Sequence, residues 1–222
     1  MTQTSPATDD GRTALILGGS GLVGGHLLKK LLEATEYKSV IALVRRPLDL
    51  RHDKLTQRIT DFEQLPRESL PPVDDVFCCL GTTIKVAGSR AAFRRVDHDY
   101  ILMAAQAALA ADARQFLLVS SLGADARSPF FYMRTKGETE AALRALPYTS
   151  LSIFRPGYLV GQRSTPRPLE DWIGKLMQRS AFLIPRAYRP IHASTVAEAM
   201  LEQAKRALPG YHLPPLFPEK NT

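Results

Sequence analysis

The amino-acid sequence predicts an α/β fold in which a parallel sheet carries helices on both faces. Short apolar runs, such as residues 13–17 and 40–44, recur along the chain, and strands that are apolar on both sides are typical of a sheet covered on both sides. Segments with the leucine spacing of an amphipathic helix alternate with these runs, first over residues 27–32. With 222 residues, of which 45% are hydrophobic, the chain suits one such domain.

The expected elements follow a polar N-terminal tail, residues 1–11, which we expect to be disordered. Helices are expected after the first strand and over residues 91–111 and 133–146, and a last one over 195–207 begins at a capping box of Thr195 and Glu198. Residues 12–222 are interpreted as a single domain, in which the proline- and arginine-rich residues from about 156 to 192 form a small C-terminal substrate lobe. The expected strands are residues 13–17, 40–44, 55–59, 76–80, 116–119 and 151–154.

A glycine-rich turn follows the first strand and opens the first helix, with a GxxGxxG spacing over residues 18–24. A tight turn and a closely approaching pyrophosphate both require backbone without a Cβ, and the start of the helix supplies free amides and the positive end of its dipole. The turn therefore predicts a Rossmann-type, doubly wound sheet that binds a dinucleotide, the alternative being a purely structural turn. The residues expected at the dinucleotide are Gly18, Ser20, Gly21, Leu22, Val23 and Gly24.

Two arginines, Arg45 and Arg46, follow the second strand. Arg45 lies 21 residues after Gly24. NAD-binding proteins usually carry an acid here for the ribose diol, whereas a guanidinium suits a 2′-phosphate through its charge and its forked hydrogen bonding. We therefore expect NADP(H) to be preferred over NAD(H), the alternative being two solvated loop residues. Asp61, after the third strand, is expected either near the adenine or as a helix cap.

Tyr132 and Lys136 lie four residues apart near the start of a helix and so share one helical face. Ser120 and Ser121 end the fifth strand, at the edge of the sheet where ligands bind in such folds. A free tyrosine titrates at about pH 10, and an adjacent ammonium favours its phenolate. This set indicates hydride transfer at a carbonyl or alcohol, with Tyr132 and Lys136 handling the proton. The alternative is a half-buried tyrosine beside a surface lysine.

These motifs together resemble the short-chain dehydrogenase/reductase superfamily, and they look most like its small atypical branch, the Tat-interacting-protein-like NAD(P)-binding oxidoreductases. The segments that carry the resemblance are residues 17–24, 78–83, 93–97, 119–125, 132–138 and 154–157. Two features depart from the family pattern: the interval of 11 residues from Ser121 to Tyr132 is short, and so is the substrate region.

The resemblance implies a Rossmann fold that binds NADP(H) at the glycine turn. It implies that Tyr132 donates or accepts the proton, that Lys136 is its partner, and that Ser121 or Ser120 orients the substrate. Further residues that it places along the cofactor are Leu80, Gly81, Thr82, Ser120, Tyr132, Lys136, Pro156 and Gly157.

The composition excludes several other classes of protein. No apolar run is long enough to span a membrane, and no signal peptide or zinc-type Cys/His cluster is recognised. Cys78 and Cys79 are adjacent and are expected to be core residues, so a reducing, cytoplasmic setting and no metal are expected. The net charge of +7 is not accompanied by any recognised nucleic-acid-binding motif, so we do not expect nucleic acid as a partner.

The charge is better explained by a small anion. Between residues 161 and 192 lie six basic and two acidic residues, so much of the excess falls in the expected substrate lobe. We interpret it as a basic mouth for an anionic cofactor and an anionic small-molecule substrate, with solvated surface as the alternative. The leading hypothesis is thus an NADP(H)-dependent oxidoreductase. Its rivals are a redox-sensing regulatory protein that binds NADPH without turnover and a nucleotide-sugar epimerase or dehydratase.

Overall fold

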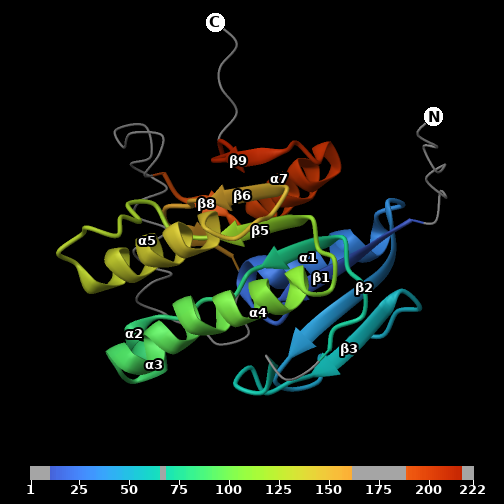
Figure 1. Ribbon diagram of the computed structural model, residues 1–222, viewed down its shortest axis with the longest axis horizontal. Helices are drawn as coiled ribbons and strands as arrows, with labels where there is room; N and C mark the ends of the chain where they lie inside the picture. The colour runs from blue at the N-terminus through green and yellow to red at the C-terminus, as the bar shows by residue number, and fades with distance from the viewer. Residues whose placement is uncertain (1–10, 66–68, 162–188, 217–222) are drawn as a thin grey trace, which may run out of the picture.

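The centre of the molecule is a sheet of seven strands in which every neighbouring pair is parallel. The computed structural model describes residues 11–65, 69–161 and 189–216. Within these segments the strand order is β3-β2-β1-β4-β5-β6-β9 (Figure 1). The doubly wound parallel sheet expected from the sequence is confirmed. The strands are β1 (Arg12–Leu17), β2 (Tyr37–Val44), β3 (Leu55–Ile59), β4 (Asp75–Cys78), β5 (Gln115–Val119), β6 (Ser150–Phe154) and β9 (Gly210–His212).

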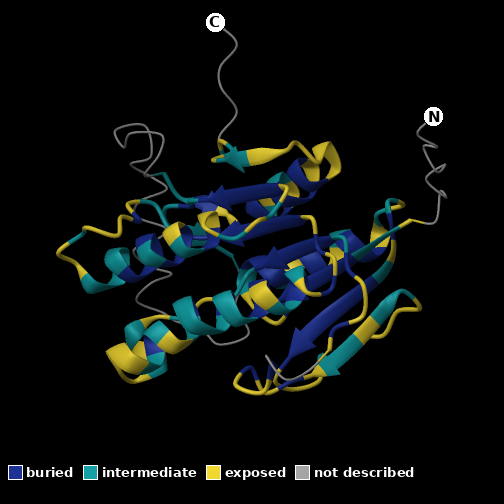
Figure 2. Cartoon of the chain, viewed as in Figure 1, coloured by how far each residue is buried: buried dark blue, intermediate teal, exposed yellow. Residues whose placement is uncertain are grey.

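Helices cover both faces of this sheet, as expected. Successive residues of a strand point to opposite faces, so Ile16 contributes to the core under α1 and α7, and Leu15 to the core under α4 and α5. The central strands are buried along their length (Figure 2), which explains why they are apolar at nearly every position. The covering helices are α1 (Leu22–Glu33) and α7 (Ala193–Arg206) on one face, and α4 (Tyr100–Leu109) and α5 (Phe131–Arg144) on the other.

The direction in which the strands are laid down reverses between β1 and β4. The chain runs outward from β1 through β2 to β3, and then returns to β4, which pairs with β1 through Leu17 and Cys78. Ligands of open α/β sheets bind beyond the carboxyl ends of the strands at such a reversal. The glycine turn over residues 18–24 follows β1 and therefore begins at this point.

The single helix expected over residues 91–111 is divided into three pieces. These are α3 (Arg90–Arg94), a π-helical turn (Arg95–Asp99) and α4. A π turn lengthens each backbone hydrogen bond by one residue and rotates the side chains that follow, and such turns are frequent at functional sites. A further short helix, α2 (Ile84–Ala87), precedes them and was not expected from the sequence.

The capping box expected at Thr195 and Glu198 is wrong. α7 begins at Ala193, with His192 as its N-cap residue and no capping hydrogen bond from a side chain. The start is fixed instead by tertiary structure, because β8 (Ile191–His192) pairs with β7 (Leu159–Val160) immediately before the helix. Thr195 consequently lies inside the first turn of α7.

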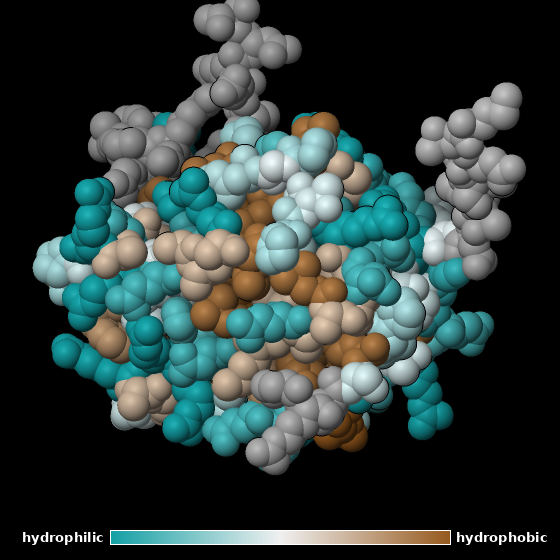
Figure 3. Space-filling model, in the orientation of Figure 1, coloured by the Kyte–Doolittle hydropathy of each residue, from teal (hydrophilic) through white to brown (hydrophobic). Residues whose placement is uncertain are grey.

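The expected substrate lobe over residues 156–192 is described only at its two ends, because residues 162–188 lie outside the described residues. Those ends are joined by the small parallel sheet of β7 and β8. In the described parts of the chain, no helix has the length and apolar character needed to cross a membrane. The face that carries α4 and α5 shows apolar side chains near its middle, with hydrophilic ones around them (Figure 3).

Candidate cofactor and active site

The turn after β1 is built so tightly that two of its residues must be glycine. Gly18 has φ of 77°, and a Cβ there would lie 2.5 Å from the carbonyl oxygen of Cys79. A Cβ on Gly24 would lie 2.1 Å from the carbonyl oxygen of Gly18. The amide of Gly21 donates to that same carbonyl at 2.8 Å, which closes the turn. The backbone of the turn is thus packed between the end of β4 and the first turn of α1.

The N-terminus of α1 keeps its amides available. Gly21 is the N-cap residue, and no side chain forms a capping hydrogen bond, so neither Leu22 nor Val23 has its amide covered by a cap. Ser20 and Gly21 are exposed, whereas Val23 is buried in the core. Uncapped amides and a positive dipole end fit a bound phosphate, and the bare backbone of the glycines lets one approach. These residues therefore fit a dinucleotide.

The residues proposed for the adenosine end lie at the same edge of the sheet. Arg45 and Arg46 directly follow β2 and are both exposed. Among the described residues, neither guanidinium has an ion-pair partner. Asp61 follows β3, and its Oδ1 accepts a hydrogen bond from the amide of Glu63 at 3.1 Å. Asp61 therefore caps a turn over residues 62–64, whereas the sequence expected it near the adenine or as a helix cap.

The segment after β4 is held by Asp97, from the π-helical turn. The amide of Thr82 donates to Asp97 Oδ2 at 2.9 Å. A Cβ on Gly81 would lie 3.4 Å from Asp97 Oδ1 and 3.6 Å from Lys136 Nζ. The backbone of residues 80–82 thus passes directly beside the ammonium of Lys136, at the carboxyl end of β4.

Lys136 is buried in an ion pair with Asp97. Its Nζ lies 2.8 Å from Asp97 Oδ1, and the two side chains are 5% and 0% exposed. Burial lowers the pKa of Lys136, but the adjacent Asp97 carboxylate outweighs that effect, so the pKa of Lys136 lies above its ordinary value and the side chain stays an ammonium. The alternative of a solvated surface lysine is therefore wrong.

Tyr132 lies one helical turn before Lys136 on the same face of α5, and it is only partly buried. Its ring packs on that of Phe93 from α3, with the ring centroids 5.2 Å apart. Tyr132 and Lys136 therefore share one face of α5, which is the arrangement that their spacing in the sequence predicts.

The two serines after β5 differ in their surroundings. Ser120 is buried and its hydroxyl donates to Glu140 Oε1 at 2.5 Å. Glu140 also pairs with Arg155, which follows β6 and donates to it from Nε at 3.1 Å. Ser121 is partly exposed, and among the described residues its Oγ forms one weak hydrogen bond, 3.4 Å long, to the carbonyl of Leu122. Only Ser121 of the two has a hydroxyl that is not already engaged with a carboxylate.

The loop after β6 joins the loop that carries these serines. The amide of Leu122 donates to the carbonyl of Pro156 at 2.9 Å, and the amide of Ser120 donates to that of Phe154 at 2.7 Å. Gly157 follows at the same edge and leads into β7. A Cβ on Gly161, just after β7, would meet the side chain of Leu22 at 2.8 Å. Residues 156–161 therefore run from the serine loop to the N-terminus of α1.

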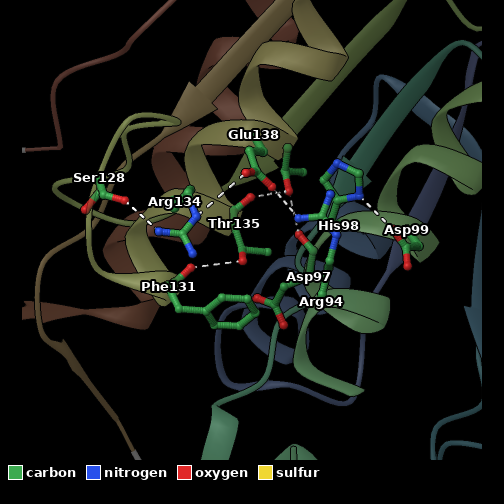
Figure 4. A network of polar contacts seen from close by, with 10 residues as sticks. Arg94, Asp97, His98, Asp99, Ser128, Phe131, Arg134, Thr135 and Glu138 are labelled. Carbon is green, nitrogen blue, oxygen red and sulfur yellow. Dashed lines mark hydrogen bonds and ion pairs between the residues drawn. The ribbon is translucent and has the colours of Figure 1, made fainter. Parts of the chain in front are cut away.

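A polar network joins the π-helical turn to α5 (Figure 4). Arg94 forms an ion pair with Glu138, and the hydroxyl of Thr139 donates to the carbonyl of Asp97 at 2.8 Å. Arg134, which lies 4.0 Å from Glu138, also donates to the carbonyl of Ser128 at 3.0 Å. These contacts hold the helix of Tyr132 and Lys136 against the segment that carries Asp97.

The sequence did not single out Asp97 or Glu140 as site residues, whereas the family resemblance had placed Arg155 with Pro156 and Gly157 beside the nicotinamide. Asp97 lies within one of the segments that carried the family resemblance, and Glu140 follows Lys136 by four residues on the same helical face. The carboxylate of Glu140 on the same helical face as Lys136 was therefore the signal from which its place in the site could have been predicted. Cys78 and Cys79 are free thiols of the core, as expected. The described residues contain no group of three or more side chains that could hold a metal ion.

Solved structures of low sequence identity share this fold. MoeE5, solved with UDP-glucose and NAD, superposes with a TM-score of 0.69 at 18% identity, over 90% of this chain and 74% of that one. UDP-glucose 4-epimerase of Thermotoga maritima, solved with UDP-glucose, superposes with a TM-score of 0.67 at 16% identity, over 90% and 75% of the two chains.

Other proteins share considerably more of the sequence. Protein HTATIP2 of Rattus norvegicus is 41% identical over 170 residues, which are 74% of this chain and 69% of that protein. Protein FMP52, mitochondrial, of Lodderomyces elongisporus is 35% identical over 211 residues, 88% of each chain. A family model described as NAD(P)H-binding matches residues 18–206. The chain therefore belongs to the NAD(P)H-binding family, within the atypical branch of the short-chain dehydrogenases/reductases that its motifs resemble.

Proposed function

We propose that the protein is an NADP(H)-dependent oxidoreductase acting on a small carbonyl or alcohol. The observation that carries this is the position of Lys136, whose buried ammonium lies beside Gly81 at the carboxyl end of β4 and one helical turn from Tyr132. Its burial is compensated by the ion pair with Asp97, so its position, and not its burial, carries the argument. Here it lies at the edge of the sheet where the glycine turn offers free amides to a dinucleotide.

Each residue of the site has a role in this proposal. The bound nicotinamide supplies or accepts the hydride. Tyr132 moves a proton to or from the substrate oxygen, and Lys136 holds that phenol and the nicotinamide ribose. Ser121 donates a hydrogen bond to the substrate oxygen, because the hydroxyl of Ser120 already binds Glu140. Pro156 and Gly157 border the nicotinamide from the end of β6.

The preference for NADP(H) is also a proposal. It rests on Arg45 and Arg46, which are exposed after β2, where a 2′-phosphate would extend from the adenosine ribose. Asp61 is proposed to border the adenine from the end of β3. A guanidinium forms charge-assisted, forked hydrogen bonds to a phosphate, so removing these side chains should affect NADPH far more than NADH.

Turnover separates this proposal from a redox-sensing protein that binds NADPH and does no chemistry. The experiment is calorimetric titration with NADPH and NADH, followed by assays of carbonyl substrates with the wild type and Tyr132→Phe. We expect NADPH to bind more tightly, Tyr132→Phe to keep that affinity, and turnover to fall by about 10²-fold or more. Equal or tighter NADH binding would contradict the role of Arg45, and turnover that survives in Tyr132→Phe would contradict the proton-transfer mechanism.

The nucleotide-sugar enzymes are the other rival, since MoeE5 and the Thermotoga epimerase were solved with UDP-sugars. UDP-glucose therefore serves as the control ligand, and we expect this protein neither to bind it nor to convert it. The proposed substrate is a small anionic molecule, and nucleic acid is not a proposed partner.

The free thiols support a reducing setting, and we propose that the protein lies in the cytoplasm. The FMP52 relatives are named mitochondrial, so fractionation of cells is the relevant test.

A further inference from the structure

Two guanidiniums lie over the ring of Phe131, the first residue of α5. The Cζ atom of Arg90, from α3, is 5.4 Å from the centroid of that ring, and the Cζ atom of Arg134 is 5.8 Å from it. The face of an aromatic ring carries partial negative charge and attracts cations. The contact therefore holds Arg90, whose side chain is otherwise exposed, against the start of the helix that carries Tyr132.

Arg90 lies at the opening of the proposed site. It precedes Phe93 by three residues in α3, so the two side chains lie on one side of that helix. The ring of Phe93 is buried and meets both rings at the start of α5, with centroid distances of 6.0 Å to Phe131 and 5.2 Å to Tyr132. The exposed Arg90 is thus one helical turn away from the buried ring that packs on Tyr132.

Positive charge exceeds negative charge around Phe131. Arg94 forms an ion pair with Glu138, and Arg134 lies 4.0 Å from the same carboxylate (Figure 4). Among the described residues, no carboxylate pairs with Arg90. Three guanidiniums therefore share one carboxylate. The other carboxylates of the neighbouring elements already contact basic side chains: Asp97 with Lys136, Asp99 with His98, Asp125 with Arg127, Glu63 with Arg95 and Glu140 with Arg155.

We propose that Arg90 determines specificity by binding a carboxylate on the substrate, so that the protein selects small aldehydes or ketones with a carboxylate at the end remote from the carbonyl. The planar fork of a guanidinium matches the two oxygens of a carboxylate. Phe131 holds Arg90 in place, and the excess charge of Arg94 and Arg134 over Glu138 adds to the attraction. The carbonyl rests on the proposed function, whereas the binding of a carboxylate does not.

The first test compares succinic semialdehyde with butanal, which has the same four carbons and no carboxylate. With NADPH, the wild type should have a kcat/KM for succinic semialdehyde that is about tenfold higher or more. Arg90→Gln should lose most of this ratio, and Arg90→Lys, which keeps the charge, should retain part of it. The control is Arg127→Gln in the loop before α5, since Arg127 pairs with Asp125; it should keep the wild-type ratio. A ratio that survives in Arg90→Gln would overturn the proposal.

The second test needs no turnover. Succinate, which carries the same carboxylate and is not reduced, is titrated at constant ionic strength into protein with ¹³C-labelled phenylalanine rings. The Phe131 resonance should shift on binding, and Arg90→Gln should weaken binding by about tenfold or more, with Arg127→Gln like the wild type. No binding to the wild type, or equal binding by Arg90→Gln, would overturn the proposal. If neither aldehyde is reduced, the proposed oxidoreductase function fails, and the succinate titration still decides the role of Arg90.

Discussion

The hydroxyl of Ser120 donates a hydrogen bond to the buried carboxylate of Glu140, which also holds the guanidinium of Arg155. The end of β5, the end of β6 and the face of α5 that carries Lys136 and Tyr132 are thereby tied to one carboxylate. Ser120 serves to hold these three elements together, and the neighbouring, partly exposed Ser121 keeps a hydroxyl that no carboxylate engages.

Ser120→Ala should therefore destabilise the protein, whereas Ser121→Ala should not. Loss of a hydrogen bond to a buried charged group costs about 1.5–3 kcal/mol, and a change at a partly exposed hydroxyl costs about 0.5 kcal/mol or less. Urea unfolding of the two variants measures both. If substrate turnover is found, Ser121→Ala should lower it by about 10²-fold, and Ser120→Ala should lower it less. The opposite order would exchange the two roles.

Gly24→Ala should abolish cofactor binding. The added methyl group would lie 2.1 Å from the carbonyl oxygen of Gly18, so the turn that receives the pyrophosphate must open. Gly25→Ala is a matched control, because its Cβ would lie 3.6 Å from the nearest atom, an ordinary contact, and alanine favours the helix by about 0.5–1 kcal/mol. Calorimetric titration with NADPH distinguishes them, and retention of wild-type affinity by Gly24→Ala would show that the turn does not hold the phosphates.

Arg45→Ala is expected to weaken NADPH binding by about tenfold or more and to leave NADH binding nearly unchanged. The reason is the loss of a charge-assisted contact to the 2′-phosphate, worth about 1.5–3 kcal/mol. Arg51→Ala changes the charge of the same loop by the same amount and is exposed as well, so it controls for general electrostatic attraction. An equal loss of affinity for NADPH and NADH would place Arg45 at the pyrophosphate that both share. No loss for either nucleotide would show that Arg45 does not contact the cofactor.

The thiols should be unreactive in the folded protein. Burial raises the pKa of Cys78 to about 12 and raises that of Cys79 well above its ordinary value, and only the thiolate is nucleophilic. At pH 8 an aromatic disulfide reagent should therefore not modify the fully buried Cys78, and should modify the partly buried Cys79 only slowly, until the chain unfolds and both thiols react. Rapid modification of the native protein at that pH would show that the end of β4 opens to solvent.

Much of the fold could be predicted because its central strands are apolar throughout. The strands around Ile16, Ile41 and Leu117 are buried on both sides, and short apolar runs of this kind are typical of a parallel sheet between two layers of helices. The glycine turn and the pair of Tyr132 and Lys136 were recognisable because local geometry demands those residues at those spacings. β9 was missed because three residues, Gly210–His212, carry too short a pattern.

The remaining features depend on contacts that no local pattern encodes. The π-helical turn over Arg95–Asp99 interrupts the regular helical spacing, and Asp97 within it is fully buried. The partner of Ser120 lies 20 residues away on another element. The start of α7 was misplaced because the pairing of Ile191 with Leu159, and not the motif at Thr195, decides where the helix begins.

The small sheet of β7 and β8 brings two distant stretches of the chain together. Leu159 pairs with Ile191 and Val160 with His192, so positions 32 residues apart in the sequence are adjacent in space. Gly161, just after β7, lies so close to Leu22 that an added Cβ would meet its side chain at 2.8 Å. The two ends of the proposed substrate lobe are therefore anchored side by side at the start of α1, and they are the natural points at which to exchange the residues between them.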